Sequence, residues 1–82
     1  MSETPDSTEP LSGLQPGQRA TVMSFDLPGS VKGRVMEMGL TKGTTVEVVR
    51  FAPLGDPMEL KVRGAHISLR KADAGGIRVQ RL

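Results

Sequence analysis

The stretch PMELKVRGAHISLR, residues 57–70, carries the clearest structural signal in the chain. Apolar and polar side chains alternate through residues 57–63 and again through residues 65–70. An alternation with a period of two is typical of antiparallel strands that bury one face. Only Gly64 separates the two runs. The pattern therefore predicts a tight β-hairpin, with one apolar face directed toward a core.

Residues on both sides of this hairpin predict further short strands. Residues 18–25 are expected to form the first strand of the chain and residues 43–51 the second. A final short strand, containing Ile77 and Val79, follows two glycines. Turn residues separate these runs at the spacing expected of a small all-β barrel or sandwich. We therefore expect about five strands.

The run over residues 43–51 changes face along its length. Val46 and Val48 share one face, whereas Val49 and Phe51 share the opposite one. A β-bulge adds one residue to a strand and lets it bend at the corner of a barrel. A bulge near Val48 and Val49 is therefore predicted.

One segment, residues 30–40, has the pattern of a helix. Val31, Val35 and Met38 recur at positions i, i+4 and i+7, which places them on one stripe of a helical surface. This short α-helix lies between the first and second predicted strands.

The ends of this helix carry recognisable signals. Ser30 is expected to be the N-cap, with its hydroxyl accepting a free backbone N–H. Gly39 is expected at the position after the helix that needs a positive φ, and Leu40 is expected to fold back onto Val35. Gly33 inside the helix costs ~1 kcal/mol relative to alanine, so the helix must be stabilised by packing on the barrel.

The 82 residues suffice for one small domain. Residues 1–10 contain three acidic residues, two prolines and no apolar residue besides Met1. Such a segment cannot bury enough surface to offset its chain entropy. A disordered acidic tail is therefore predicted over residues 1–10, and a single folded domain over residues 11–82.

Several kinds of site are excluded by residues that the chain lacks. It has no cysteine, hence no disulfide, thiolate zinc site or thiol nucleophile, which fits a reducing compartment such as the cytoplasm. No apolar run approaches the roughly 18–20 residues that span a bilayer, so no membrane insertion is expected. His66 is the only imidazole, and its strand position points it away from the core. Because a metal site normally needs three or four protein ligands, neither a metal site nor a cofactor is predicted.

Catalytic patterns are also missing from the sequence. No Ser–His–acid grouping stands in a plausible register, and no Gly-rich phosphate loop is present. A groove for polyproline ligands needs an aromatic lining, but the only aromatic residues, Phe25 and Phe51, lie in predicted strands and are expected to be buried. The chain is therefore predicted not to be an enzyme.

Nucleic-acid binding is the alternative that the charges leave open. Residues 11–82 contain all 11 basic residues but only six of the nine acidic ones. A basic face for phosphates could be formed by Lys32, Arg34, Lys61, Arg63, Arg70, Lys71, Arg78 and Arg81. An RNA-binding SH3-like barrel of the KOW type, found in ribosomal proteins and translation factors, would fit this charge. Stacking aromatics are missing, however, and acids are interspersed among the bases, so nucleic acid is not the expected partner.

The segment APLGDP, residues 52–57, predicts a stiff loop. Prolines restrict both of its ends, Gly55 permits a left-handed conformation, and Asp56 is extended because a proline follows it. Leu54 then lies near the tip of the loop. It either folds back over the mouth of the barrel or forms a preformed contact for a protein partner, with little ordering cost on binding.

Taken together, these motifs resemble the bacterial ferrous iron transport protein A (FeoA) family. The resemblance rests on Glu37-Met38-Gly39-Leu40, Gly43, Val46-Glu47-Val48, Ala52-Pro53-Leu54-Gly55-Asp56-Pro57, Leu69-Arg70, Ala74, Ile77 and Val79. It implies an SH3-like barrel over residues 11–82. It also implies a small cytosolic accessory to the membrane permease for Fe(II), whose cytoplasmic part carries a GTP-binding domain. Whether such an accessory activates GTP hydrolysis, gates the pore or assembles the permease is left open, as is its oligomeric state.

This resemblance directs attention to the helix and the two-proline loop. Lys32 and Arg34 are too polar for the buried stripe of the helix, and the loop needs little ordering. A patch with an apolar centre and a charged rim suits a transient protein contact. The residues expected to bind the permease are Lys32, Arg34, Leu54, Gly55, Asp56 and Pro57.

Overall fold

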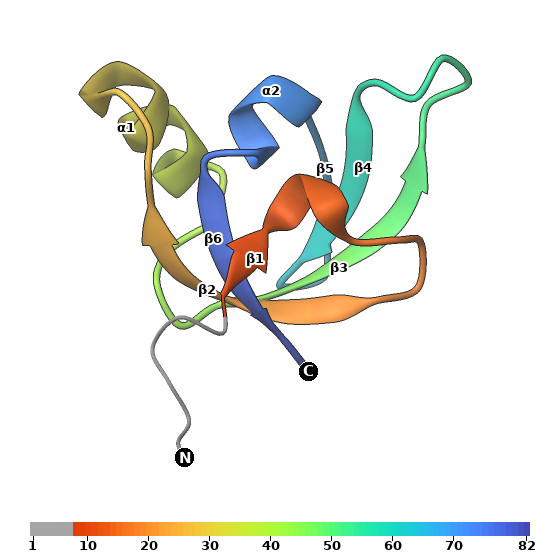
Figure 1. The fold of residues 1–82 in the computed structure, drawn as a ribbon, viewed down its shortest axis with the longest axis horizontal. Coiled ribbons are helices and arrows are strands. Elements are labelled where there is room, and N and C mark those ends of the chain that lie inside the picture. The colour runs from red at the N-terminus through yellow and green to blue at the C-terminus, as the bar shows by residue number, and fades with distance from the viewer. Residues whose placement is uncertain (1–7) are drawn as a thin grey trace.

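The computed structural model describes residues 8–82, which form one antiparallel sheet curled into a small barrel with helices at one end (Figure 1). The elements in chain order are β1 (Glu9–Pro10), the 3-10 turn η2 (Leu11–Gly13), β2 (Arg19–Phe25), α1 (Gly29–Glu37), β3 (Thr45–Phe51), β4 (Met58–Val62), β5 (Ala65–Leu69), α2 (Lys71–Ala74) and β6 (Ile77–Arg81). The strands are ordered β1-β6-β2-β3-β4-β5. This is the all-β, SH3-like architecture expected from the sequence, with α1 between the first two long strands. The short β1 and α2 are additional to it.

The predicted hairpin is formed by β4 and β5. Val62 pairs with Ala65 across a two-residue turn made of Arg63 and Gly64. Both turn residues have positive φ, 53° for Arg63 and 81° for Gly64. Two-residue turns of this handedness match the right-handed twist of the strands they connect. The hairpin prediction is confirmed, with a turn one residue longer than the sequence pattern indicated.

The predicted bulge also lies where the sequence placed it. Val48 pairs with Leu60, whereas Arg50 pairs with Glu59, so Val49 has no opposite residue on β4. Because of the extra residue, the side chains that follow it lie on the opposite face of the sheet from the one that simple alternation would give. Phe51 consequently turns toward the core, while Val49 remains on the outer face with 38% of its surface exposed.

The N-cap of the helix lies two residues earlier than expected. Ser30 is not the N-cap, because α1 already includes Gly29 and the capping position is held by Pro28. The N–H of Lys32 donates to the carbonyl of Pro28 at 2.8 Å. Proline starts the helix here because its restricted φ suits the residue at a helix start and its missing N–H would have no helical partner. The Ser30 prediction is therefore wrong.

The other end of α1 closes as predicted. Gly39 has φ of 104°, and its N–H donates to the carbonyl of Met36 at 3.0 Å. The N–H of Leu40 donates to the carbonyl of Val35 at 3.1 Å. These two bonds make a Schellman motif, in which the chain turns back over the last helical carbonyls. Leu40 and Val35 are both fully buried, so this closure fixes α1 on the barrel.

The core fills the interior of the sheet and extends beneath η2, α1 and α2. It consists of Leu11, Leu14, Ala20, Val22, Val35, Leu40, Val46, Val48, Met58, Leu60, Val62, Leu69, Ala74, Ile77 and Val79. Phe25 and Phe51 pack against this cluster but are only partly buried, which corrects the expectation that both are enclosed. No helix in the described part of the chain is long and apolar enough to cross a membrane.

The boundary expected at residue 10 needs correction. Most of the predicted tail, residues 1–7, lies outside the described residues, but Glu9 and Pro10 form β1 and pair with β6. The Glu9 carboxylate accepts from Arg81 at 2.7 Å. Proline is tolerated here because β1 is an edge strand. Residues from opposite ends of the chain make this contact, so a local composition argument could not reveal it.

Candidate protein-binding surface

The two-proline loop between β3 and β4 is closed by its own backbone. The N–H of Gly55 donates to the carbonyl of Ala52 at 2.7 Å, and the N–H of Ala52 donates to the carbonyl of Pro57 at 2.9 Å. Gly55 has φ of 88°, which glycine adopts without steric cost. Leu54 at the tip is 97% exposed. Of the two alternatives for Leu54, folding over the barrel mouth is therefore excluded by the structure.

Asp56 has a structural contact that the sequence did not suggest. Its Oδ1 accepts the backbone N–H of Lys71 at 3.0 Å, and Lys71 is the first residue of α2. The carboxylate thus satisfies one of the free N–H groups at the start of this short helix. Asp56 joins the loop to α2 and is not a purely solvent-facing charge.

The charged residues of α1 also contact other elements. An Nη of Arg34 lies 3.0 Å from Oδ2 of Asp73 on α2. The Nζ of Lys32 lies 5.7 Å from the centre of the Phe25 ring, within the range of a cation–π interaction. Arg34 therefore connects α1 to α2, while Lys32 covers an aromatic ring at the end of β2.

Helix α2 lies between the two groups of predicted binding residues. Figure 1 shows α1, α2 and the β3–β4 loop at the same end of the barrel, with α2 in the middle. The structure thus brings Arg34 and the loop residues to one surface through α2, whereas Lys32 lies over Phe25 instead. Four residues, KADA, make up α2, and this length is too short for any helical periodicity to be detected. Sequence reasoning therefore missed the element that joins the surface.

Two clefts run beside α2 and add residues that the sequence did not single out. One, of about 640 Å³, separates α1 from the end of β5 and is lined by Arg34, Met38, Ser68, Leu69, Arg70, Ala72 and Asp73. The other, of about 350 Å³, lies under the loop and is lined by Asp56, Pro57 and Arg70. Arg70 lines both clefts, so they form parts of one continuous surface.

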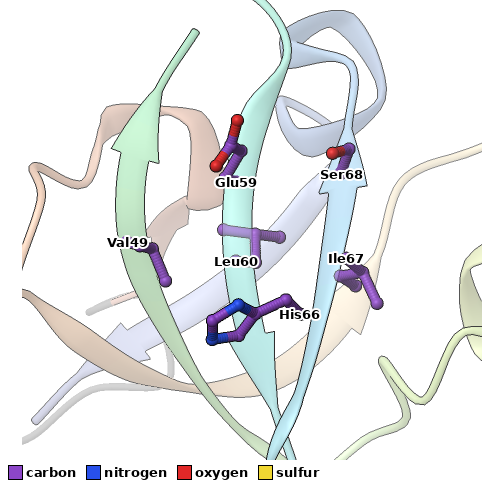
Figure 2. A pocket seen from close by; sticks show the side chains of 6 residues that line it. All are labelled: Val49, Glu59, Leu60, His66, Ile67 and Ser68. Carbon is purple, nitrogen blue, oxygen red and sulfur yellow. The ribbon is translucent and has the colours of Figure 1, made fainter.

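A third, smaller hollow lies on the outer face of the sheet (Figure 2). It is lined by Val49, Glu59, Leu60, His66, Ile67 and Ser68, with a volume of about 80 Å³. His66 is exposed there, as its strand position predicted. Glu59 is paired with Arg50 at 3.1 Å. Among residues 8–82 no three His, Cys, Asp or Glu side chains are grouped as metal ligands would be. The absence of a metal site stays a prediction for measurement.

Comparison with known proteins identifies the family. The sequence model of the FeoA domain matches residues 9–81 of this chain. The chain belongs to the FeoA family. The matched range begins at the first residue of β1. FeoA proteins are linked to ferrous iron transport, as one relative shows directly.

That relative is the Fe(2+) transport protein A/Fe(2+) transporter FeoB fusion protein of Porphyromonas gingivalis, 37% identical over 70 residues. The match covers 85% of this chain but only 8% of the fusion protein. In it an FeoA segment and the transporter FeoB share one polypeptide.

Solved structures agree with the assignment to FeoA. The FeoA protein of Chlorobium tepidum is 42% identical, with a TM-score of 0.84 over 89% of this chain and 70% of its own. A manganese-dependent transcriptional repressor is 20% identical, with a TM-score of 0.86 over 96% of this chain and 38% of its own. At that identity the likeness to the repressor shows a shared fold alone.

Proposed function

We propose that this chain is a cytoplasmic accessory of ferrous iron uptake. It acts by binding the GTP-binding cytoplasmic part of the FeoB-type permease, through the surface formed by the β3–β4 loop, α2 and α1. The observation that carries the proposal is Leu54, a large apolar side chain 97% exposed on a loop closed by its own backbone. The fusion of FeoA and FeoB in one relative supports the choice of partner.

The loop has the physical properties of a preformed contact. Its two internal hydrogen bonds and the contact of Asp56 with α2 hold it in one shape before binding. Binding therefore costs little conformational entropy. Burying a leucine side chain stabilises a complex by roughly 1.5–3 kcal/mol. Charged groups on the same surface, Arg34 with Asp73 beside α2 and Arg70 in the two clefts, supply the polar part expected of such a contact.

The charges favour this proposal over RNA binding. Three arginines are engaged with carboxylates: Arg34 with Asp73, Arg50 with Glu59 and Arg81 with Glu9. Lys32 and Lys71 lie over the rings of Phe25 and Phe51. The basic side chains are thus dispersed among acids and rings and do not form a single stripe for phosphates. In this role the chain acts through its contact with the permease and carries out no catalytic step of its own.

Titration calorimetry with the purified cytoplasmic part of the cognate permease tests this function. We expect a saturable complex with the wild-type chain, measured with GTP, with GDP and without nucleotide. Leu54→Asp is expected to weaken it at least tenfold. Leu82→Asp is the matched control, because Leu82 is also exposed, at 68%, but lies at the C-terminus away from the loop (Figure 1).

Two results would contradict the proposal. One is the absence of any complex between the wild-type chain and the permease part. The other is binding of RNA by the chain. RNA that co-purifies with the chain, and an affinity for RNA that falls steeply as the salt concentration rises, would favour the RNA-binding alternative. If the complex forms, the rate of GTP hydrolysis with and without the chain then separates activation from assembly.

A further inference from the structure

Strand β5 ends the sheet with a free edge. Within the described residues it pairs with β4 alone and is last in the strand order. Because Val62 and Ala65 flank a two-residue turn, they form a hydrogen-bonded pair, and such pairs recur at every second residue. The N–H and C=O groups of Ala65, Ile67 and Leu69 therefore point toward β4, whereas those of His66 and Ser68 point outward. No backbone partner for His66 or Ser68 is found on this side among residues 8–82.

This edge lacks several of the usual protections against strand pairing. Exposed edges are normally blocked by lysine, proline, a bulge or an inward-pointing charge. The strand Ala65–Leu69 contains no lysine or proline, and its register with β4 is uninterrupted. Both His66 and Ser68 are exposed. Four backbone groups are thus accessible in a row, in the arrangement that an added strand requires.

A groove lies beside this edge. The cleft between β5 and α1 is lined by Ser68, Leu69 and Arg70 on one side and by Arg34 and Met38 on the other. Leu69 is 4% exposed, and Ile67 and Met38 are half-buried against the core. An extended segment laid along β5 would place every second side chain over this groove, beside Met38 and Leu69, because strand side chains alternate between faces.

The charges along the edge select the kind of segment. Residues 63–71 contain Arg63, Arg70 and Lys71 and no Asp or Glu. Arg34 is balanced by Asp73, but Arg70 has no ion-pair partner among residues 8–82. An acidic segment would therefore be attracted to this edge, and a basic one repelled.

A second copy of the chain fits the edge poorly. Symmetric antiparallel pairing about Ile67 would place Arg63 of one copy opposite Lys71 of the other. Like charges directly opposite each other destabilise a strand pair, so this symmetric pairing of two copies is disfavoured.

We infer that the groove between β5 and α1 accepts an extended segment, acidic and with alternating apolar residues, from the cytoplasmic part of the permease, which adds as a strand to β5. This inference rests on the proposed function and specifies how the partner is held. The loop at Leu54 and the β5 edge are then two parts of one binding surface, joined by Arg70 and α2.

Hydrogen exchange of the isotope-labelled full chain tests the inference, with the purified cytoplasmic part of the permease as the probe. The outward amides of His66 and Ser68 have no backbone partner among residues 8–82, so we expect them to gain protection when a strand is added. At a probe concentration of 100 times Kd we expect their exchange to slow about 100-fold.

Variants of the edge supply the matched comparison. Ser68→Pro removes an outward N–H, which edge strands tolerate, and is expected to raise Kd at least tenfold. Ser68→Ala keeps the backbone donor and should bind within about twofold of the wild type. Arg70→Glu should weaken binding about tenfold, whereas Arg19→Glu, which changes the net charge equally on β2, should not. If Ser68→Pro fails to fold, the exchange of the two wild-type amides and the Arg70→Glu comparison still decide.

The outcomes separate the inference from the proposed function. If the permease part binds and Leu54→Asp weakens it, but the His66 and Ser68 amides stay unprotected, strand addition is overturned and the proposed function stands. If the wild-type chain does not bind at all, both are overturned. Protection of the same amides by raising the concentration of the chain alone would show that a second copy, not the permease, occupies the edge.

Discussion

Replacing Leu54 and Val62 by aspartate separates binding from stability, because the two side chains have opposite surroundings. Leu54 is 97% exposed and Val62 is 2% exposed. The hydrogen bonds that close the loop involve backbone groups only, so Leu54→Asp removes no contact of the folded state. Substitutions at exposed positions of this kind change the free energy of unfolding by no more than about 0.5 kcal/mol. In a domain of this size that shifts the melting temperature by roughly 2–4 °C at most.

Val62→Asp is expected to unfold the chain. Val62 lies in the core, opposite Val46 on β3 and Ala65 on β5. A carboxylate there has no partner, and burying an unpaired charge costs several kcal/mol or forces the group to become neutral. Small domains are stable by only about 5–15 kcal/mol, and one with so few residues lies toward the lower end. One such substitution is therefore sufficient to abolish cooperative folding.

The binding effect of Leu54→Asp is larger than its stability effect. If the partner buries Leu54, losing that burial removes roughly 1.5–3 kcal/mol, which corresponds to about a 10–150-fold rise in Kd. Circular dichroism melts measure the first quantity and titration calorimetry with the permease part measures the second. Iron uptake in cells complemented with each variant gives the physiological readout. Leu54→Asp should impair uptake while leaving the melting curve nearly unchanged.

Two results would refute this reasoning. If Leu54→Asp destabilises the chain as strongly as Val62→Asp does, Leu54 belongs to the core in solution and the interface assignment is wrong. If Leu54→Asp leaves stability, binding and uptake unchanged, the loop is a connector and the partner binds elsewhere. Leu54→Ala provides a milder variant, which should reduce affinity without adding a charge.

Four further outcomes are expected from the same structure. Asp56→Ala should lower the free energy of unfolding by ~1 kcal/mol because α2 loses its cap. A melting temperature equal to that of the wild type would show that this contact does not stabilise the fold. Gly33→Ala should raise stability by up to ~1 kcal/mol, since a Cβ there meets no atom within 4 Å, and a lower melting temperature would contradict it. Deleting residues 1–7 should leave the melting temperature unchanged. Deleting residues 1–10 removes β1 and its pairing with β6, and should lower the free energy of unfolding by about 1–3 kcal/mol. Equal melting temperatures for the two deletions would show that β1 does not contribute to stability. Purified chain should bind neither Fe(II) nor Zn(II) stoichiometrically, and a calorimetric 1:1 site that His66→Ala abolishes would overturn that expectation.

Local signals in the sequence were sufficient for the hairpin, the bulge and the end of α1. Each depends on neighbours within a few residues: alternation in β4 and β5, the change of face at Val49, and glycine at the positive φ of Gly39. The start of α1 was predicted wrongly because both Ser30 and Pro28 suit the start of a helix, and the N-cap is Pro28. Such signals report the conformation of a segment and say little about what the segment touches.

The amino-acid sequence by itself determined which faces of the strands are buried, where the chain turns and which family it resembles, because these follow from side-chain periodicity and backbone sterics. Only the tertiary structure decided what surrounds the candidate surface. Asp56 meets α2 across 15 residues of sequence, Arg34 meets Asp73 across 39, and Arg81 meets Glu9 across 72. These contacts arise because barrel closure brings distant segments to one end of the sheet. No local pattern encodes that proximity, so the role of Asp56, the presence of β1 and the free edge of β5 became visible only in the folded chain.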